Sequence, residues 1–185
     1  DVSLIDQANA YRALANGGVW SPVRWRLDEA AGAPRRVLSA PAAHIVSDIL
    51  ADPAARAPTF GLDSPLATAY WAAVKTGTSK NLRDNWCLGY SRDYTVAVWV
   101  GNFEGDAMRD VSGTSGAAPA WREIMDALQP APSGPPPAPA GVVAVDVRFE
   151  PPLEPARTEW FVAGTESEVV QLTGPAGRPR IVAPP

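Results

Sequence analysis

Lysine, histidine and cysteine are all scarce in this sequence of 185 residues. Two lysines, Lys75 and Lys80, stand against fourteen arginines, and there is one histidine, His44, and one cysteine, Cys87. A single cysteine excludes an internal disulfide, and no histidine, cysteine or carboxylate cluster has the spacing of zinc ligands. The sequence therefore predicts no metal or other cofactor. Both lysines fall within one short segment, residues 75–80.

Long apolar runs and an excess of charge are also missing. No run approaches the roughly 20 residues that span a bilayer, so we expect no membrane segment within these residues. A net charge of −4 argues against a nucleic-acid partner, and a hydrophobic content of 46% excludes disorder throughout. The sequence starts at Asp1, without an initiator methionine or a signal-like segment, so we expect a piece of a longer protein.

Proline is concentrated towards the C-terminus, where six of the eleven positions from 130 to 140 are proline. Such a stretch favours an extended spacer of the polyproline type. It divides the sequence into a main body at 1–129, a proline-rich linker at 130–140 and a C-terminal module at 141–185.

Three helices are predicted in the body. Ser3 and Asp6 have the spacing of a capping box before an apolar repeat of helical period. Ser39 precedes a second helix, which Pro53 ends, and Pro119 fits the first turn of a third. A loop rich in glycine and serine, at 104–117, leads into this third helix. Its apolar face is predicted to consist of Trp121, Ile124, Met125 and Leu128.

Strand patterns fill the middle of the body, at residues 19–27, 70–78, 85–90 and 94–101. The last two are joined by a tight turn at 91–93, so they should form an antiparallel hairpin. The fold class is therefore α+β, with helices packed on an antiparallel sheet.

The C-terminal module shows strand patterns alone. Apolar and polar residues alternate from 143 to 149, and further strand candidates lie at 160–163, 168–172 and 180–183. We therefore expect a small all-β module after the linker.

The segment with the clearest chemistry is the Lys-Thr-Gly box, which consists of Lys75, Thr76, Gly77 and Thr78. It ends an apolar strand. An ammonium and two hydroxyls there can hold a carboxylate, and the missing side chain of Gly77 lets a peptide approach the strand edge. A backbone N–H beyond the glycine can face an oxyanion. The sequence alone leaves open a plain strand end that enters a turn, because three-residue matches are common.

The box is similar to that of penicillin-binding proteins and serine β-lactamases. Its flanks extend the resemblance to class A penicillin-binding proteins, with the 1C type as the nearest match. They include the hairpin strands, the start of the last helix and the N-terminal helix with its glycine pair. They also include a stretch beyond the linker that resembles the start of the 1C β domain. These segments lie at 85–90, 94–102, 115–121, 4–18, 153–157 and 159–161.

Two further motifs of that family have no counterpart here. Its nucleophile lies in a Ser-x-x-Lys box, and no serine of this sequence has a lysine three residues later. Its Ser-x-Asn box matches only Ser79-Lys80-Asn81, which directly follows the Lys-Thr-Gly box rather than standing across a cleft from it, so we reject this match. We therefore expect the C-terminal part of a transpeptidase domain, inactive without the part that bears the nucleophile.

The resemblance implies a serine D,D-transpeptidase of a bifunctional peptidoglycan synthase, on the periplasmic side of the bacterial inner membrane. Its partners would be D-Ala-D-Ala stem peptides, β-lactams as inhibitors, and the remainder of the transpeptidase domain. Lys75, Thr76 and Thr78 would hold the substrate carboxylate, Gly77 would permit its approach, and the Thr78 N–H would be an oxyanion donor. The alternatives are a non-catalytic cell-envelope scaffold, and a hydrolase of the β-lactamase or D,D-carboxypeptidase kind.

Three weaker candidates are interpreted structurally. His44 fits a helical histidine better than a general base, and Cys87, between Trp86 and Leu88, fits a small buried hydrophobe better than a nucleophile. The glycines at 113 and 116 precede a helix, where an anion could bind, but a plain flexible loop is the simpler interpretation.

Overall fold

The computed structural model describes residues 2–61, 63–173 and 180–181. The chain divides into two compact units, Asp1–Pro137 and Ala138–Pro185, and each is described by itself. The division falls inside the proline-rich stretch at 130–140.

The described residues of the first unit form four α-helices, and serine or aspartate side chains cap three of them. The side chain of Ser3 accepts a hydrogen bond from the Asp6 N–H, Ser39 accepts from Ala42, and Asp52 accepts from Ala54. Each cap satisfies a backbone donor that the first helical turn leaves unpaired. The helices are α1 (Leu4–Ala15), α2 (Ala40–Ala51), α3 (Pro53–Phe60) and α4 (Ala118–Leu128).

A three-stranded antiparallel sheet lies at the centre of this unit, in the order β3-β4-β5. Its strands are β3 (Ala73–Thr78), β4 (Asp84–Tyr90) and β5 (Thr95–Gly101). The predicted hairpin is confirmed: Cys87 pairs with Val98, and the Ser91 N–H donates to the Tyr94 carbonyl across the turn. β3 is an edge strand of the sheet as the described residues form it.

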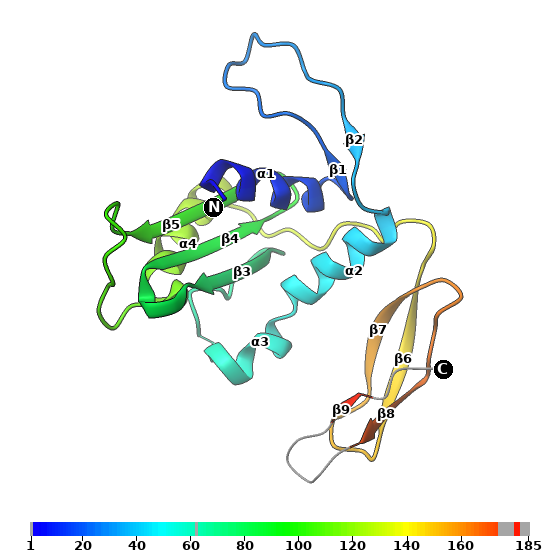
Figure 1. Cartoon of the computed structure of the whole chain (residues 1–185). Helices are drawn as coiled ribbons and strands as arrows, with labels where there is room; N and C mark the ends of the chain where they lie inside the picture. Colours follow the sequence, from blue (N-terminus) through cyan, green and yellow to red (C-terminus); the bar gives the residue numbers. More distant parts are fainter. Residues whose placement is uncertain (1, 62, 174–179, 182–185) are drawn as a thin grey trace. The chain divides into compact units, whose positions relative to one another are not determined.

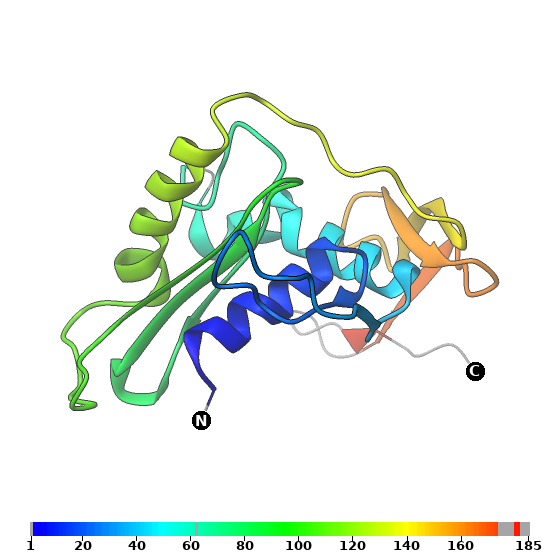
Figure 2. The same cartoon turned by 90° about the horizontal axis from the view of Figure 1, so that it is seen from above.

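Helices cover both faces of this sheet, with α1 on one side and α4 on the other (Figures 1 and 2). Successive side chains of β4 point to opposite faces of the sheet, so the apolar residues of this strand contribute to both faces. Tyr90 points to the first face, where its ring meets Tyr11 edge-on and its hydroxyl lies 2.6 Å from that of Ser47 on α2. Gly89 faces α4, and a Cβ there would come within 2.6 Å of the Trp121 ring. The α+β class and the antiparallel sheet are thus confirmed.

Two predicted strands are shorter than the pattern indicated. The strand expected at 19–27 ends at Trp20, and β1 (Val19–Trp20) pairs only with β2 (Arg35–Arg36). Beyond it, the guanidinium of Arg12 takes the carbonyls of Ser21 and Pro22, so these carbonyls do not join a ladder. The strand expected from residue 70 starts at Ala73, because the N–H of Trp71 donates to Ser133 instead.

Helix α3 was not predicted. Pro53 does end α2, but with Asp52 as the cap it also opens a new helix, since a proline at the first helical position loses no hydrogen bond.

The predicted face of α4 is also partly wrong. Ala118, Trp121 and Met125 are buried, whereas Ile124 and Leu128 are exposed.

The loop expected at 104–117 is not a loop throughout. Its last five residues, Gly113–Ala117, form a π-helical turn (η2) that runs directly into α4. The Ala118 N–H donates to the Gly113 carbonyl, which is the i→i+5 bond of such a turn.

The described residues of the second unit form strands and no helix. The sheet has the order β7-β6-β8-β9, and β6 and β8 are parallel, which the sequence did not indicate. Val147 and Phe149 of β6 are buried, and the guanidinium of Arg157 lies 4.9 Å from the Phe149 ring centre. Residues 182–183 of the last predicted strand lie outside the described residues. The strands are β6 (Val142–Glu150), β7 (Arg157–Val162), β8 (Val169–Thr173) and β9 (Arg180–Ile181).

Candidate active site

The Lys-Thr-Gly box forms the last four residues of β3. The edge of β3 that faces away from β4 pairs with no strand of the described chain, so a further extended segment can reach its backbone. Successive side chains of a strand point to opposite faces. Thr76 and Thr78 therefore share the α4 face of the sheet, whereas Lys75 and Gly77 lie on the other.

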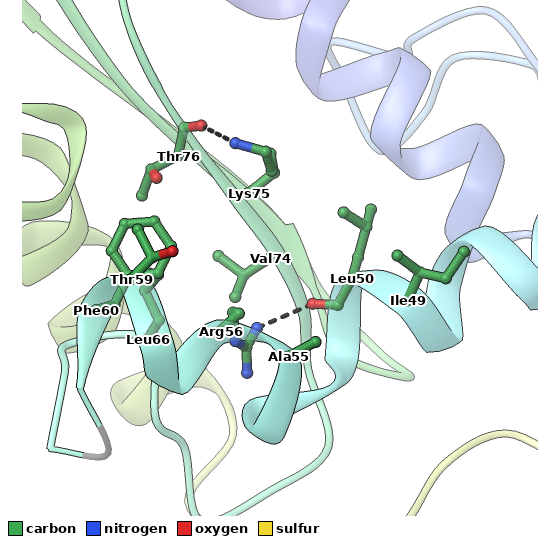
Figure 3. A pocket seen from close by; sticks show the side chains of 10 residues that line it. All are labelled: Ile49, Leu50, Ala55, Arg56, Thr59, Phe60, Leu66, Val74, Lys75 and Thr76. Carbon is green, nitrogen blue, oxygen red and sulfur yellow. Dashed lines mark hydrogen bonds between the residues drawn. The ribbon is translucent and has the colours of Figure 1, made fainter. Parts of the chain in front are cut away.

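The four residues of the box differ in accessibility. Lys75 and Thr78 are exposed, Gly77 is half-buried, and Thr76 is buried at 9% exposure. The Lys75 Nζ donates to the carbonyl of Thr76 at 2.6 Å, which holds the ammonium at the strand edge (Figure 3). A cation and a nearby hydroxyl donor in an accessible position can bind a carboxylate.

The packing of the sheet does not require a glycine at position 77. A Cβ at this position would lie 3.5 Å from the Trp86 Cβ, which is ordinary van der Waals contact. Because Gly77 has no side chain, nothing projects from the strand at this position, and a bound molecule can lie close to the backbone.

A cavity of about 220 Å³ opens beside Lys75 and Thr76. Figure 3 shows α2 and α3 forming its other walls. The guanidinium of Arg56 donates to the carbonyls of Leu50 and Ala51 at the end of α2, and burial lowers its pKa from the ordinary value. The lining residues are Ile49, Leu50, Ala55, Arg56, Thr59, Phe60, Leu66, Val74, Lys75 and Thr76.

Sequence reasoning missed this cavity because it missed α3. The Asp52-Pro53 pair was the available signal, since aspartate before proline is typical of a helix start. It also missed the contact of Thr78 with the distant η2 turn, where the Gly113 N–H donates to the Thr78 Oγ1 at 2.9 Å.

The glycine-rich turn is ordered by its own side chains, so its interpretation as a plain flexible loop is wrong. The Ser112 N–H donates to the Ser115 Oγ, and the Ser115 N–H donates to the Ser112 Oγ. The Gly116 N–H donates to the Ser112 carbonyl. These donors are used within the turn and are not available to an anion.

The remaining candidates lie outside the box. His44 is half-buried on α2. Ser79-Lys80-Asn81 lies in the turn between β3 and β4, and Lys80 is exposed there. Within residues 2–61, 63–173 and 180–181, no three histidine, cysteine or acidic side chains gather closely enough to hold a metal ion.

Cys87 is fully buried in β4, as its apolar neighbours predicted. Burial raises the pKa of its thiol to about 12, although the charges of Arg56 and Lys75 oppose the change. Since the thiolate is the reactive form, we expect a thiol reagent at mildly alkaline pH to label the chain only after denaturation. Rapid labelling of the native chain, measured by mass spectrometry, would contradict the buried role.

The turn that follows the box is held by Asp84. Its carboxylate accepts from the Trp99 Nε1 at 3.0 Å, and its N–H donates to the Ser79 Oγ. Hydrogen bonds from Ser79 and Trp99 lower the pKa of Asp84 from its ordinary value of 3.8.

A lowered carboxyl pKa predicts a defined pH dependence of stability. The contribution of ionised Asp84 is present above pH 3.8 and is lost as the pH falls through the lower folded-state value. Asp84→Asn should therefore reduce the free energy of unfolding near neutral pH, by about 1 kcal/mol or less. Denaturant unfolding at several pH values tests this, and a difference that persists unchanged in strong acid would contradict it.

Known proteins resemble this chain in sequence. Penicillin-binding protein 1C of Escherichia coli (strain K12) is 33% identical over 125 residues, which is 68% of this chain and 16% of that protein. Penicillin-binding protein 1A of Clostridium acetobutylicum is 32% identical over 134 residues, 64% of this chain and 15% of that protein. The chain is a homologue of the penicillin-binding proteins. No family model matches it.

Solved structures of class A penicillin-binding proteins share the fold. Penicillin-binding protein 1A of Haemophilus influenzae superposes with a TM-score of 0.68 at 20% identity, over 89% of this chain and 32% of that one. PonA1 of Mycobacterium tuberculosis superposes with a TM-score of 0.54 at 22% identity, over 74% of this chain and 40% of that one. The resemblance to class A penicillin-binding proteins is confirmed, and the chain spans about a sixth of the length of the curated relatives named above.

Proposed function

We propose that this chain forms the Lys-Thr-Gly wall of the active site of a serine D,D-transpeptidase that cross-links peptidoglycan. The observation that carries the proposal is the position of the box, on the open edge of β3 and beside a cavity. Lys75, Thr76 and Thr78 would hold the carboxylate of the donor peptide, and Gly77 would let that peptide approach. The backbone N–H of Thr78 would serve as one of two oxyanion donors.

The nucleophile of this reaction must come from residues outside this sequence. The family's serine precedes its lysine by three positions, and here Ala72 and Gly77 stand three positions before the two lysines. In the complete enzyme, the serine hydroxyl would attack the D-Ala-D-Ala peptide bond and release the terminal D-alanine. An amine of a neighbouring stem peptide would then displace the serine from the acyl-enzyme. β-Lactams would acylate the same serine.

The whole protein would be a bifunctional peptidoglycan synthase on the periplasmic side of the inner membrane. Its homologues among the penicillin-binding proteins support this setting. No helix in the described part of the chain is long and apolar enough to cross a membrane.

Labelled penicillin tests the division of the site between two parts of the protein. We expect the 185-residue chain alone to form no covalent adduct, because it has no Ser-x-x-Lys nucleophile. The longer protein that carries this segment should form one adduct per molecule, on a serine outside these residues. Mass spectrometry of the intact proteins and of their peptides measures both results.

Three outcomes would contradict the proposal. A stoichiometric adduct on a serine of this chain, such as Ser79 or Ser115, would show that the site is complete here. Absence of any adduct on the longer protein would favour a non-catalytic scaffold. With a D-Ala-D-Ala peptide and an acceptor amine, the longer protein should form the cross-linked product, and hydrolysis alone would indicate a carboxypeptidase or β-lactamase.

A further inference from the structure

The end of the Lys-Thr-Gly box is in direct contact with a turn that lies 35 residues further along the chain. The backbone N–H of Gly113, the first residue of η2, donates to the Oγ1 of Thr78 at 2.9 Å. Gly113 is buried, whereas Thr78 is exposed. The buried N–H of Gly113 therefore holds the hydroxyl of Thr78, a residue that is itself accessible to solvent.

Only glycine fits at position 113. A Cβ there would come within 2.5 Å of the Gly77 carbonyl oxygen and 2.7 Å of the Trp86 carbonyl oxygen. Both are backbone atoms of paired strands, so neither can move aside without a shift of the sheet. The glycine is thus needed for its small size, and it brings η2 onto the backbone of the box itself.

The backbone that carries the Gly113 N–H is fixed by neighbouring hydrogen bonds and by the core. Ser112 and Ser115 form a reciprocal capping box at the start of η2, which fixes the backbone on either side of Gly113. The turn continues into α4, and Trp121 of that helix is fully buried against the sheet. The Gly113 N–H is therefore held in place by the core of the unit.

A threonine hydroxyl has one donor and two acceptor positions. When Thr78 accepts from Gly113, its side-chain rotamer is restrained and its single O–H remains free to donate to a bound anion. We propose that Gly113, supported by the Ser112–Ser115 capping box, is a positioning residue that aims the Thr78 hydroxyl at the substrate carboxylate. The proposal rests on the proposed function, because it concerns the same carboxylate.

The test uses the longer protein that carries this segment and compares Gly113→Ala, Thr78→Val and the double variant. Each is assayed for its second-order acylation rate with benzylpenicillin and with benzylpenicillin methyl ester, which lacks the carboxylate charge. Both single variants should acylate about 10- to 100-fold more slowly with the free acid, the range for one hydrogen bond to a charged group. With the ester, the rate of Thr78→Val should stay near that of the unmodified protein. Gly113→Ala, whose Cβ also displaces the backbone of the box, should lose less with the ester than with the free acid.

Further variants separate positioning from general damage. Measured as the ratio of the acid rate to the ester rate, the loss in the double variant should be no larger than in Thr78→Val alone. Thr78→Ser should keep most of the rate because it keeps the hydroxyl. Gly134→Ala is the matched control, since a Cβ there meets nothing within 4 Å and the free-acid rate should not change. Equal losses with acid and ester would reveal a merely structural role and overturn the proposal.

A second measurement keeps the test decisive if Gly113→Ala does not fold. In the 185-residue chain, Thr78→Val should speed hydrogen exchange of the Gly113 amide about tenfold or more, since that amide loses its acceptor. Unchanged exchange would overturn the contact. Lys75→Ala separates the two claims: if it slows acylation while Gly113→Ala does not, the positioning role fails and the proposed function stands. If neither variant slows acylation, the proposed function itself fails.

Discussion

Replacement of Lys75 by alanine in the longer protein is expected to slow acylation by β-lactams about 30- to 5,000-fold. Lys75 lies on the edge of a paired strand, where its ammonium is held beside the cavity by the Thr76 carbonyl. Loss of a charge-assisted contact in a closed cleft costs about 2–5 kcal/mol, and each 1.4 kcal/mol corresponds to about a tenfold change in rate. The other wall of that cleft would come from the remainder of the domain.

Lys80→Ala is the matched control for this prediction. Lys80 is only five residues away, but it is exposed in the turn after β3, where a solvated charge contributes little. Its loss should leave the second-order rate nearly unchanged. Lys75→Arg should restore the rate only in part, because a planar guanidinium does not occupy the position of a compact ammonium. Equal rates for Lys75→Ala and the unmodified protein would show that the box is structural.

Trp121→Ala should destabilise the chain by about 3–5 kcal/mol, the range for removal of a buried aromatic side chain. Trp121 is fully buried in the core between α4 and the sheet, and its ring fills the space above Gly89. The neighbouring strands cannot collapse into the vacated volume, since their backbones are fixed by the β3-β4-β5 ladder.

Ile124→Ala on the same helix separates burial from helix propensity. Ile124 is 44% exposed, so its truncation should cost about 1 kcal/mol or less. The free energy of unfolding of the three proteins, from denaturant titration of the 185-residue chain, gives both differences. Similar losses for the two variants would mean that α4 does not present Trp121 to the sheet.

The parts of the fold that the sequence predicted are those encoded by local chemistry. Ser3 and Ser39 cap their helices because a short hydroxyl side chain can reach the unpaired N–H groups of the next turn. The hairpin of β4 and β5 follows from a tight turn between two apolar runs. Both signals lie within a few residues of the structure they specify.

The errors arise where distant groups compete for the same backbone. The guanidinium of Arg12 donates to a carbonyl beyond Trp20, where the strand was expected to continue. The N–H of Trp71, before β3, donates to the Ser133 carbonyl. Neither partner is visible from the local pattern. The parallel pairing of β6 with β8 likewise depends on how the chain crosses over, which alternation of side chains does not encode.

The candidate site divides in the same way. Lys75, Thr76, Gly77 and Thr78 are consecutive, so their motif could be found in the sequence alone. Arg56, which lines the cavity, lies 19 residues before Lys75, and Gly113 lies 35 residues after Thr78. These contacts exist only once the sheet has formed.

A crystal structure of the longer protein after reaction with benzylpenicillin would show whether the Lys-Thr-Gly box binds the carboxylate. We expect the carboxylate of the bound penicillin to lie within hydrogen-bond distance of the Thr76 and Thr78 hydroxyls, with the Lys75 ammonium nearby. The acyl bond should join the penicillin to a serine outside these 185 residues. A penicillin whose carboxylate lies away from β3, with the box in contact only with its own chain, would contradict the account.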